Sequence, residues 1–364
     1  MRVEFEQSPD LTALLDEWTR LYEASDARFF LSPPWIGTWV GETPATVDVG
    51  CVRVFDDLRG VYGLALVGAP QRASVLRTST ARLHESGQAK LDSIYIEYND
   101  ILLAQDAPAG AREAAIEAVI DALPRVDEFV FRNARPALAR AIETVAADRA
   151  METRVALSQM TFEIPLGETA VIDALSSSLK AKIRRSIRRY EERGPLVLER
   201  AENAEDRSVY WTELMRLHAQ TWARRGKKGV FREPAFTGFH TRLIENRPEW
   251  IDLVRLTAGR ETVGVLYNFV DDERVYNYQS GFLYEADNQF APGFVSHVLA
   301  AERYREEGYA VYDMMGGGGD YKKRLGREGE TLQTIVLTRP GVRLRMRSFG
   351  QRLMRVRFEG TRQT

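Results

Sequence analysis

The segment 276–326 constrains the fold of this 364-residue chain more than any other stretch. Residues 276–280 alternate in the manner of a strand, and Pro292 and Gly293 then open a segment whose apolar residues recur at helical spacing. A second short strand is expected over 311–315, before four consecutive glycines and a basic run. Because free N–H groups and the helix dipole favour anions at a helix start, we expect a phosphate-bearing acyl carrier there.

An earlier segment, residues 95–133, repeats this order of strand, loop, helix and strand. Two short motifs carry the correspondence: Ala107, Pro108 and Gly110 match residues 291–293, and Tyr98 matches Tyr278. Only the second copy contains the glycine run and Lys322, so we expect its chemistry to lie there. The pattern predicts two related α/β domains, an N-terminal degenerate copy over 1–165 and a C-terminal copy over 166–340.

The rest of the chain is expected to alternate between helices and short strands. The predicted helices cover 10–24, 36–40, 110–123, 136–147, 174–193, 204–225 and 234–245. The predicted strands cover 47–55, 61–67, 93–103, 128–132, 158–164, 250–257, 262–270 and 331–338.

Composition excludes several classes of protein. The formal net charge of −2 does not favour binding to DNA, and a single cysteine, Cys51, leaves no internal disulfide and no cysteine-based zinc site. The four histidines are scattered, so we expect no metal. The start of the chain lacks an apolar signal region and no run reaches the length of a membrane span, so a cytoplasmic enzyme is expected.

Two basic segments have two interpretations each. The helix expected over 174–193 carries six cationic residues, Lys180, Lys182, Arg184, Arg185, Arg188 and Arg189. These form either a solvated face or a surface for an anionic ligand. The tail 341–364 is a basic amphipathic helix that can rest on an anionic membrane surface or pack on its parent domain, and we favour packing.

Several motifs resemble the GNAT-like acyltransferase family described in cellulose-biosynthesis and related polysaccharide loci. The motifs are Tyr-Gln-Ser-Gly-Phe over 278–282, Ala-Pro-Gly over 291–293, Tyr-Asp-Met-Met over 312–315 and the run 321–326, with weaker ones at 35–39, 97–100, 217–218 and 221–226. That family is similar to the Fem-type aminoacyltransferases of peptidoglycan assembly. The resemblance covers about residues 10–340. It implies two tandem GNAT-type domains, each a mixed, mostly antiparallel sheet flanked by helices, with acyl-CoA bound in the second.

The resemblance also implies where the donor binds. The pantetheine arm is expected along Gln279, Ser280, Gly281 and Phe282, and the pyrophosphate at the loop containing Gln289, Phe290, Ala291 and Gly293. Three residues are candidates for catalysis: Tyr278 as acid or carbonyl donor, Asp313 as base or orienting group, and Lys322 for an acceptor carboxylate or phosphate. Each also has a structural interpretation, as strand packing, a turn cap and a solvated turn. The expected acceptor-side residues are His218, Trp222, Gly316, Gly317, Tyr321 and Arg324.

Three functions stay open at this point. The first is N-acyl transfer from acetyl-CoA or another acyl-CoA to an amine on a small molecule, peptide or saccharide, by direct attack. The second takes aminoacyl-tRNA as the donor, because Pro292 lacks an N–H in the expected phosphate loop and the helix over 174–193 is basic. The third is a non-catalytic binding protein that docks through the tail.

Overall fold

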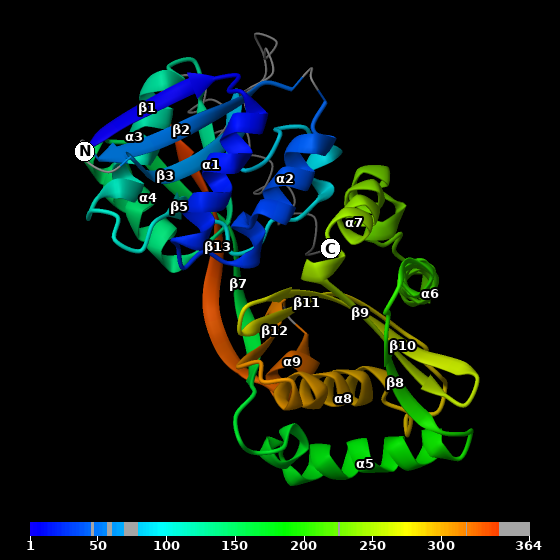
Figure 1. Cartoon of the computed structure of the whole chain (residues 1–364). Coiled ribbons are helices and arrows are strands. Elements are labelled where there is room, and N and C mark those ends of the chain that lie inside the picture. The colour runs from blue at the N-terminus through cyan, green and yellow to red at the C-terminus, as the bar shows by residue number, and fades with distance from the viewer. Residues whose placement is uncertain (45–46, 57–59, 69–78, 225, 318, 342–364) are drawn as a thin grey trace, which may run out of the picture.

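The computed structural model describes residues 1–44, 47–56, 60–68, 79–224, 226–317 and 319–341. Both halves of the chain share one mixed sheet in the strand order β1-β2-β3-β4-β6-β13-β7-β12-β11-β10-β9-β8, with β5 paired to β3 outside this path. Figure 1 shows the two halves joined by the long strands β7 and β13. The expected fold class is confirmed, although the two expected sheets are continuous.

The strands and helices have the following bounds. The strands are β1 (Arg2–Gln7), β2 (Val49–Asp56), β3 (Gly60–Gly68), β4 (Thr80–Leu83), β5 (Leu102–Leu103), β6 (Glu128–Ala134), β7 (Glu152–Pro165), β8 (Leu196–Arg200), β9 (Ile251–Ala258), β10 (Glu261–Asp271), β11 (Arg274–Phe282), β12 (Val311–Gly316) and β13 (Arg327–Thr338). The helices are α1 (Leu11–Glu23), α2 (Pro33–Glu42), α3 (Ala111–Ala122), α4 (Pro136–Asp148), α5 (Ser177–Glu191), α6 (Ala204–Arg224), α7 (Pro234–Asn246), α8 (Pro292–Glu306) and α9 (Asp320–Leu325).

The last strand, β13, returns to the first half of the chain. It pairs antiparallel with β6 on one edge and with β7 on the other. Strand β7 also pairs with β12, so its two ends lie in different halves of the sheet. The division at residue 165 stays a prediction, and residues 327–338 lie with the sheet of the first half.

The two halves repeat the same arrangement around one helix. In the second half, β11 is antiparallel to β10, and α8 then leads to β12, which is parallel to β11. In the first half, β5 is antiparallel to β3, and α3 leads to β6, where Ala134 forms a parallel bridge with Asn99. This correspondence supports the predicted repeat.

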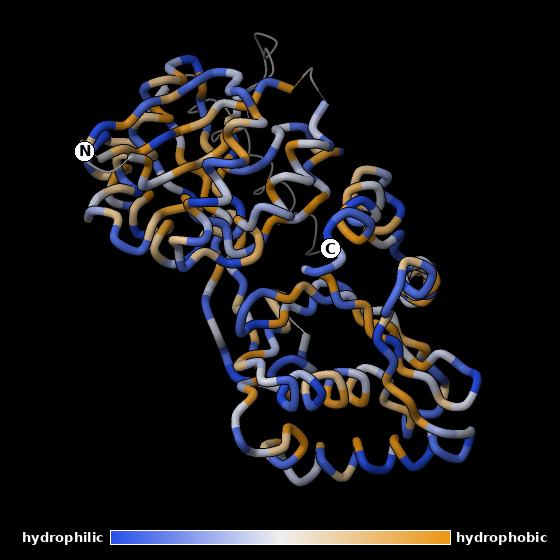
Figure 2. The backbone as a smooth tube through the Cα atoms, viewed as in Figure 1, coloured by the Kyte–Doolittle hydropathy of each residue, from blue (hydrophilic) through white to orange (hydrophobic). Residues whose placement is uncertain are grey.

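Helices cover both faces of the sheet in the second half. Leu214 and Leu217 of α6 pack in one core cluster with Val265 and Tyr267 of β10, whereas Val295 of α8 packs in another. Helix α5 lies below α8, with its apolar residues turned inward and its polar residues outward (Figure 2). The split between β11 and β12 is therefore enclosed from both sides.

The predicted strand over 93–103 is wrong. The chain forms a short 3-10 turn at Leu91–Ser93, and only Leu102–Leu103 is a strand. Tyr98 has a φ of 48°, a left-handed conformation that a strand does not accommodate. Strands β1, β4 and β8 and helix α9 were not predicted, because each spans only four to six residues, too few for a periodic pattern to be distinguished.

The amphipathic tail predicted over 341–364 lies almost entirely outside the described residues, which end at Gly341. Within the part of the chain that the structure describes, no helix is both long and apolar enough to cross a membrane.

Candidate active site

The site lies where two parallel strands separate. β11 and β12 pair over only three positions, Arg274 to Tyr276 against Val311 to Asp313. Beyond Tyr276, β11 continues to Phe282 and stays paired with β10 on its other edge. The edge of β11 that faces the split therefore has backbone groups without a neighbouring strand.

A cavity of about 390 Å³ opens at this split, and another of about 440 Å³ lies in the first half. The predicted site residues that line the cavity at the split are His218, Trp222, Tyr278, Gln279, Ser280, Phe282, Phe290, Ala291, Gly293, Tyr321 and Lys322. The predicted residues that do not line it are Gly281, Gln289, Asp313, Gly316, Gly317 and Arg324. The structure thus brings together most of the donor side and part of the expected acceptor side.

The start of α8 offers fewer free N–H groups than a helix start usually does. The Ala291 N–H donates to Ser186 Oγ at 2.9 Å, and the Gln289 N–H donates to Asp287 Oδ1 at 2.9 Å. Pro292 has no N–H at all. Among the described residues, the N–H groups of Gly293 and Phe294 are then the first without an acceptor in the protein.

Cationic side chains surround this helix start. Lys182 Nζ lies 5.4 Å from the centre of the Phe294 ring, and the Arg324 guanidinium lies 5.1 Å from it. Lys182 also lines the cavity. An anionic group at this end of the cavity would meet two backbone donors and the Lys182 ammonium, while Arg324 lies near Phe294 but does not line the cavity.

Gly281 does not touch the cavity but sets its shape. A Cβ at Gly281 would lie 2.8 Å from the Leu214 carbonyl oxygen and 3.0 Å from Leu217 Cβ. The absence of a side chain therefore lets α6 approach β11. This contact places His218 and Trp222 of α6 at the cavity wall.

His218 and Trp222 interact with each other within the wall. Trp222 Nε1 donates to His218 Nε2 at 2.7 Å, and the His218 side chain is buried. Because Nε2 accepts this bond, it is not free to take a proton from a substrate. The pair therefore forms a polar part of the wall.

Lys322 enters the cavity from α9. Its ammonium group donates to the Gly316 carbonyl at 2.5 Å and to the Met315 carbonyl at 3.4 Å. Burial lowers the pKa of Lys322, and the nearby Glu97 and Asp313 carboxylates oppose that shift. With two neutral carbonyl partners, the ammonium keeps positive charge available for a substrate oxygen.

The buried side chain of Asp313 forms hydrogen bonds with residues of both halves of the chain. Its Oδ2 accepts from Tyr98 Oη at 2.7 Å and from Arg274 Nη1 at 3.0 Å, and its Oδ1 accepts from the Met315 N–H at 2.7 Å. Burial raises the pKa of Asp313, while Tyr98 and Arg274 oppose the rise. Since Asp313 is fully buried and both of its carboxylate oxygens already accept hydrogen bonds, this geometry favours a positioning role over direct proton transfer.

Glu97 is absent from the predicted site residues, although its side chain interacts with residues of the candidate site. The Gly316 N–H donates to its Oε2 at 3.1 Å. Burial raises the pKa of Glu97. The only signal in the sequence was membership of the motif at 97–100, because an irregular segment has no periodicity to reveal which side chains converge.

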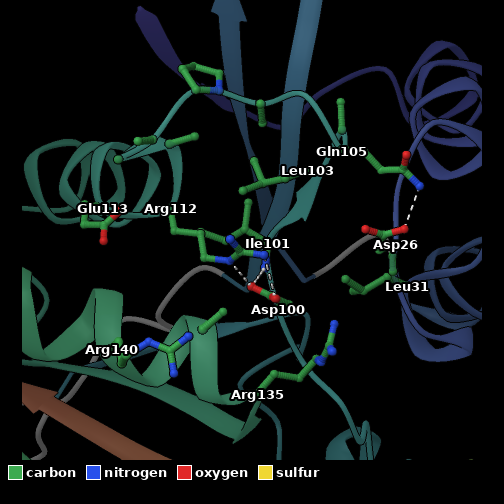
Figure 3. A pocket seen from close by; sticks show the side chains of 18 of the residues that line it. Asp26, Leu31, Asp100, Ile101, Leu103, Gln105, Arg112, Glu113, Arg135 and Arg140 are labelled. Carbon is green, nitrogen blue, oxygen red and sulfur yellow. Dashed lines mark hydrogen bonds and ion pairs between the residues drawn. The ribbon is translucent and has the colours of Figure 1, made fainter.

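The first half contains the larger of these two cavities, at the start of α3 (Figure 3). Its arginines are mostly neutralised within the protein. Arg112 forms two hydrogen bonds with Asp100, and Arg135 forms two with Glu330. Because Lys322 and the edge of β11 line the cavity in the second half, that cavity is the candidate donor site.

A mixed sheet, a split between parallel strands and a helix starting at that split define the class of fold known as GNAT. Residues 177–323 match the family described as "Acetyltransferase (GNAT) domain". This match confirms the predicted class of enzyme, an acyltransferase of the GNAT type.

Solved structures show the same fold at low sequence identity. The structure titled "Crystal structure of FemX" aligns over 89% of this chain and 95% of its own, with a TM-score of 0.58 and 10% identity. A conserved protein of unknown function from Bacteroides thetaiotaomicron aligns over 93% and 100%, with a TM-score of 0.58 and 10% identity. L-PGS from Bacillus licheniformis aligns over 94% and 96%, with a TM-score of 0.52 and 12% identity. The comparison with curated proteins gave no match.

The polysaccharide-locus part of the resemblance stays a prediction. In the described part of the chain, no group of three or more histidine, cysteine, aspartate or glutamate side chains is arranged to hold a metal ion.

Proposed function

We propose that this protein transfers an acyl group from acyl-CoA to an amine in the cavity at the β11–β12 split. The observation that carries the proposal is the unpaired edge of β11, which lines a cavity that contains Lys322 at one side and the start of α8 at another. An extended chain with amide groups can pair with such an edge as an added strand. The pantetheine arm of CoA is a chain of this kind.

The phosphate end of the donor would lie at α8. Gly293 and Phe294 offer N–H groups there, and Lys182 and Arg324 offer positive charge. Because two of the four groups are flexible cations rather than backbone, we expect this end to bind with a clear dependence on salt.

The acyl carbonyl would lie near Lys322. Its ammonium group would stabilise the negative charge that develops on the carbonyl oxygen during attack. Tyr278 lines the same cavity, and burial raises its pKa well above the usual value, so its hydroxyl stays protonated. It would donate to the leaving thiolate by exchanging its long, 3.4 Å hydrogen bond to the Tyr95 carbonyl for this new partner. Direct attack fits better than a covalent route, because Cys51 is buried in the first half and burial raises its thiol pKa to about 12.

Calorimetric titration with acetyl-CoA and longer acyl-CoAs tests the donor. We expect binding by the intact protein that weakens when Lys182 is replaced by alanine, with Lys90→Ala in the first half as the control. Absence of binding to every acyl-CoA would overturn this version of the function.

A second donor, aminoacyl-tRNA, is favoured by one observation. Arg184, Arg185 and Arg188 are exposed on α5, on the same side of the molecule as the start of α8. The resemblance to Fem-type enzymes implies this donor, and the fold is similar to that of FemX. A gel shift with bulk tRNA at low salt, lost steeply as salt rises and lost in an Arg185→Glu, Arg188→Glu variant, would support it. If the protein gives no gel shift with tRNA at low salt, aminoacyl-tRNA is excluded as the donor.

The acceptor class within this proposal is a small molecule, peptide or saccharide with an amine. A cytoplasmic, biosynthetic setting stays a prediction. Packing of the tail 341–364 on its parent domain also stays a prediction, with contact to an anionic membrane surface as its alternative.

A further inference from the structure

A segment of the first half lies across the ends of β11 and β12. From this segment, residues 95–98, three groups contact the second half. Glu97 accepts the Gly316 N–H, Tyr98 donates to Asp313, and the Tyr95 carbonyl accepts from Tyr278 Oη at 3.4 Å. The first half of the chain therefore covers one side of the candidate active site in the second half.

Hydrogen bonds from other residues hold this segment in place. Asn133 Nδ2 donates to the Ile96 carbonyl at 2.9 Å, and Gln159 Nε2 donates to Asn133 Oδ1 at 3.1 Å. Tyr98 keeps its left-handed φ of 48° within this network. An unusual backbone conformation fixed by several buried contacts is the kind of arrangement that positions functional groups.

The Glu97 carboxylate has one occupied and one available oxygen. Oε2 accepts the Gly316 N–H, whereas Oε1 has no hydrogen-bond partner among the residues that the structure describes. The charged and titratable groups that interact with it are Lys322 of α9, Asp313 of β12, Tyr278 of β11 and the adjacent Tyr98. Lys322 and Tyr278 line the cavity in which we place the acyl group, and Glu97 is a partly exposed side chain beside that lining.

We propose that Glu97 binds the ammonium group of the acceptor and takes its first proton, so that the acceptor site is built between the two halves. This inference rests on the proposed acyl transfer. The acceptor is thus a primary amine that arrives protonated, and its neighbour on the donor side is Lys322.

The protons balance along this route. The ammonium loses one proton to Glu97, which later releases it to solvent. The amine nitrogen then forms a bond to the acyl carbon, and the carbon–sulfur bond breaks as the tetrahedral intermediate collapses. The second proton leaves the nitrogen and reaches the thiolate, so the products are an amide and free CoA thiol. Burial raises the pKa of Glu97 and so makes its carboxylate a stronger base toward an ammonium.

The test compares Glu97→Gln with the wild type. Glutamine keeps the shape of the side chain and an oxygen for the Gly316 N–H, but cannot take a proton at neutral pH. The matched control is Glu328→Gln, because Glu328 is an exposed carboxylate on β13. Thiol release from acetyl-CoA is followed with ethanolamine, glucosamine, lysine and spermidine as acceptors, over pH 5 to 9.

We expect Glu97→Gln to lower kcat/KM about 100-fold or more and to lose the rise of kcat/KM with pH that deprotonation of Glu97 produces. Acetyl-CoA affinity and thermal stability should stay as in the wild type, and Glu97→Asp should restore part of the activity. The inference is overturned if Glu97→Gln keeps wild-type kcat/KM and pH profile, or if its activity falls only together with its melting temperature. A wild type that binds no acyl-CoA instead overturns the proposed function on which the inference rests.

Discussion

The hydrogen bond between Tyr98 and Asp313 should contribute measurably to the stability that couples the two halves. Tyr98 Oη donates to Asp313 Oδ2 at 2.7 Å, and both side chains are almost fully buried. In Tyr98→Phe, Oδ2 would keep only Arg274 as a partner. A hydrogen bond to a charged group contributes about 1.5–3 kcal/mol, so we expect the free energy of unfolding to fall by about 2 kcal/mol.

Urea denaturation followed by fluorescence measures this loss, with Tyr309→Phe as the control. The Tyr309 hydroxyl is partly exposed and has no hydrogen-bond partner among the described residues, so its removal should cost less than about 0.5 kcal/mol. On an Asp313→Asn background, where the acceptor is neutral, the same change at Tyr98 should cost about 1 kcal/mol. Equal losses in Tyr98→Phe and Tyr309→Phe, or strict additivity with Asp313→Asn, would refute the reasoning.

Three further predictions concern the second half. Lys322→Met should lower kcat by about 100-fold or more while the calorimetric affinity for acetyl-CoA changes little; an unchanged kcat would remove Lys322 from the mechanism. Gly281→Ala should destabilise the fold by about 1–3 kcal/mol, because the new Cβ meets the Leu214 carbonyl. The control Gly238→Ala in α7, where a Cβ would have nothing within 4 Å, should not destabilise it. Equal melting temperatures of the two variants would contradict the predicted contact. Burial lowers the pKa of His297 from 6.5 to about 3, so between these pH values the unfolded chain binds a proton at this residue that the folded chain does not. The free energy of unfolding should therefore rise by up to about 1.4 kcal/mol per pH unit between pH 3 and 6.5 and then level off. In His297→Asn, denaturation at pH 4, 5, 6 and 7 should show a smaller slope. The remainder is due to His84, whose pKa is lowered to about 4, and to His240, whose pKa burial also lowers. An unchanged slope would contradict this assignment.

Regular elements with a clear period were predictable from the sequence. Helices α5 and α8 have apolar residues at helical spacing, and the structure buries Leu179, Ile183 and Val295 as that spacing requires. The strands β2, β3, β9 and β10 were also expected, since each is a run rich in apolar residues, and the structure pairs β2 with β3 and β9 with β10. Local pattern suffices where one face of an element is buried along its whole length.

The candidate site was only partly predictable because its parts come together through tertiary contacts. Lys322 reaches the cavity from a six-residue helix that follows the glycine run, and so short a helix has no periodicity to reveal it. Glu97 lies in a segment that was expected to be a strand, in which the direction of its side chain would have been different. No rule of spacing relates residue 97 to Gly316, because sheet topology alone brings them together.

The start of α8 shows most clearly why a motif does not by itself define a binding site. The resemblance implied that the loop from Gln289 to Gly293 binds a pyrophosphate through backbone N–H groups, yet the N–H groups of Gln289 and Ala291 donate to Asp287 and Ser186. Ser186 belongs to α5, so the basic helix reaches the donor loop directly and removes one of its anion-binding groups. Positive charge on Lys182, from the same helix, lies at the cavity in its place. The affinity for a phosphate-bearing donor should therefore depend on side-chain charge from α5 more than on the helix dipole of α8.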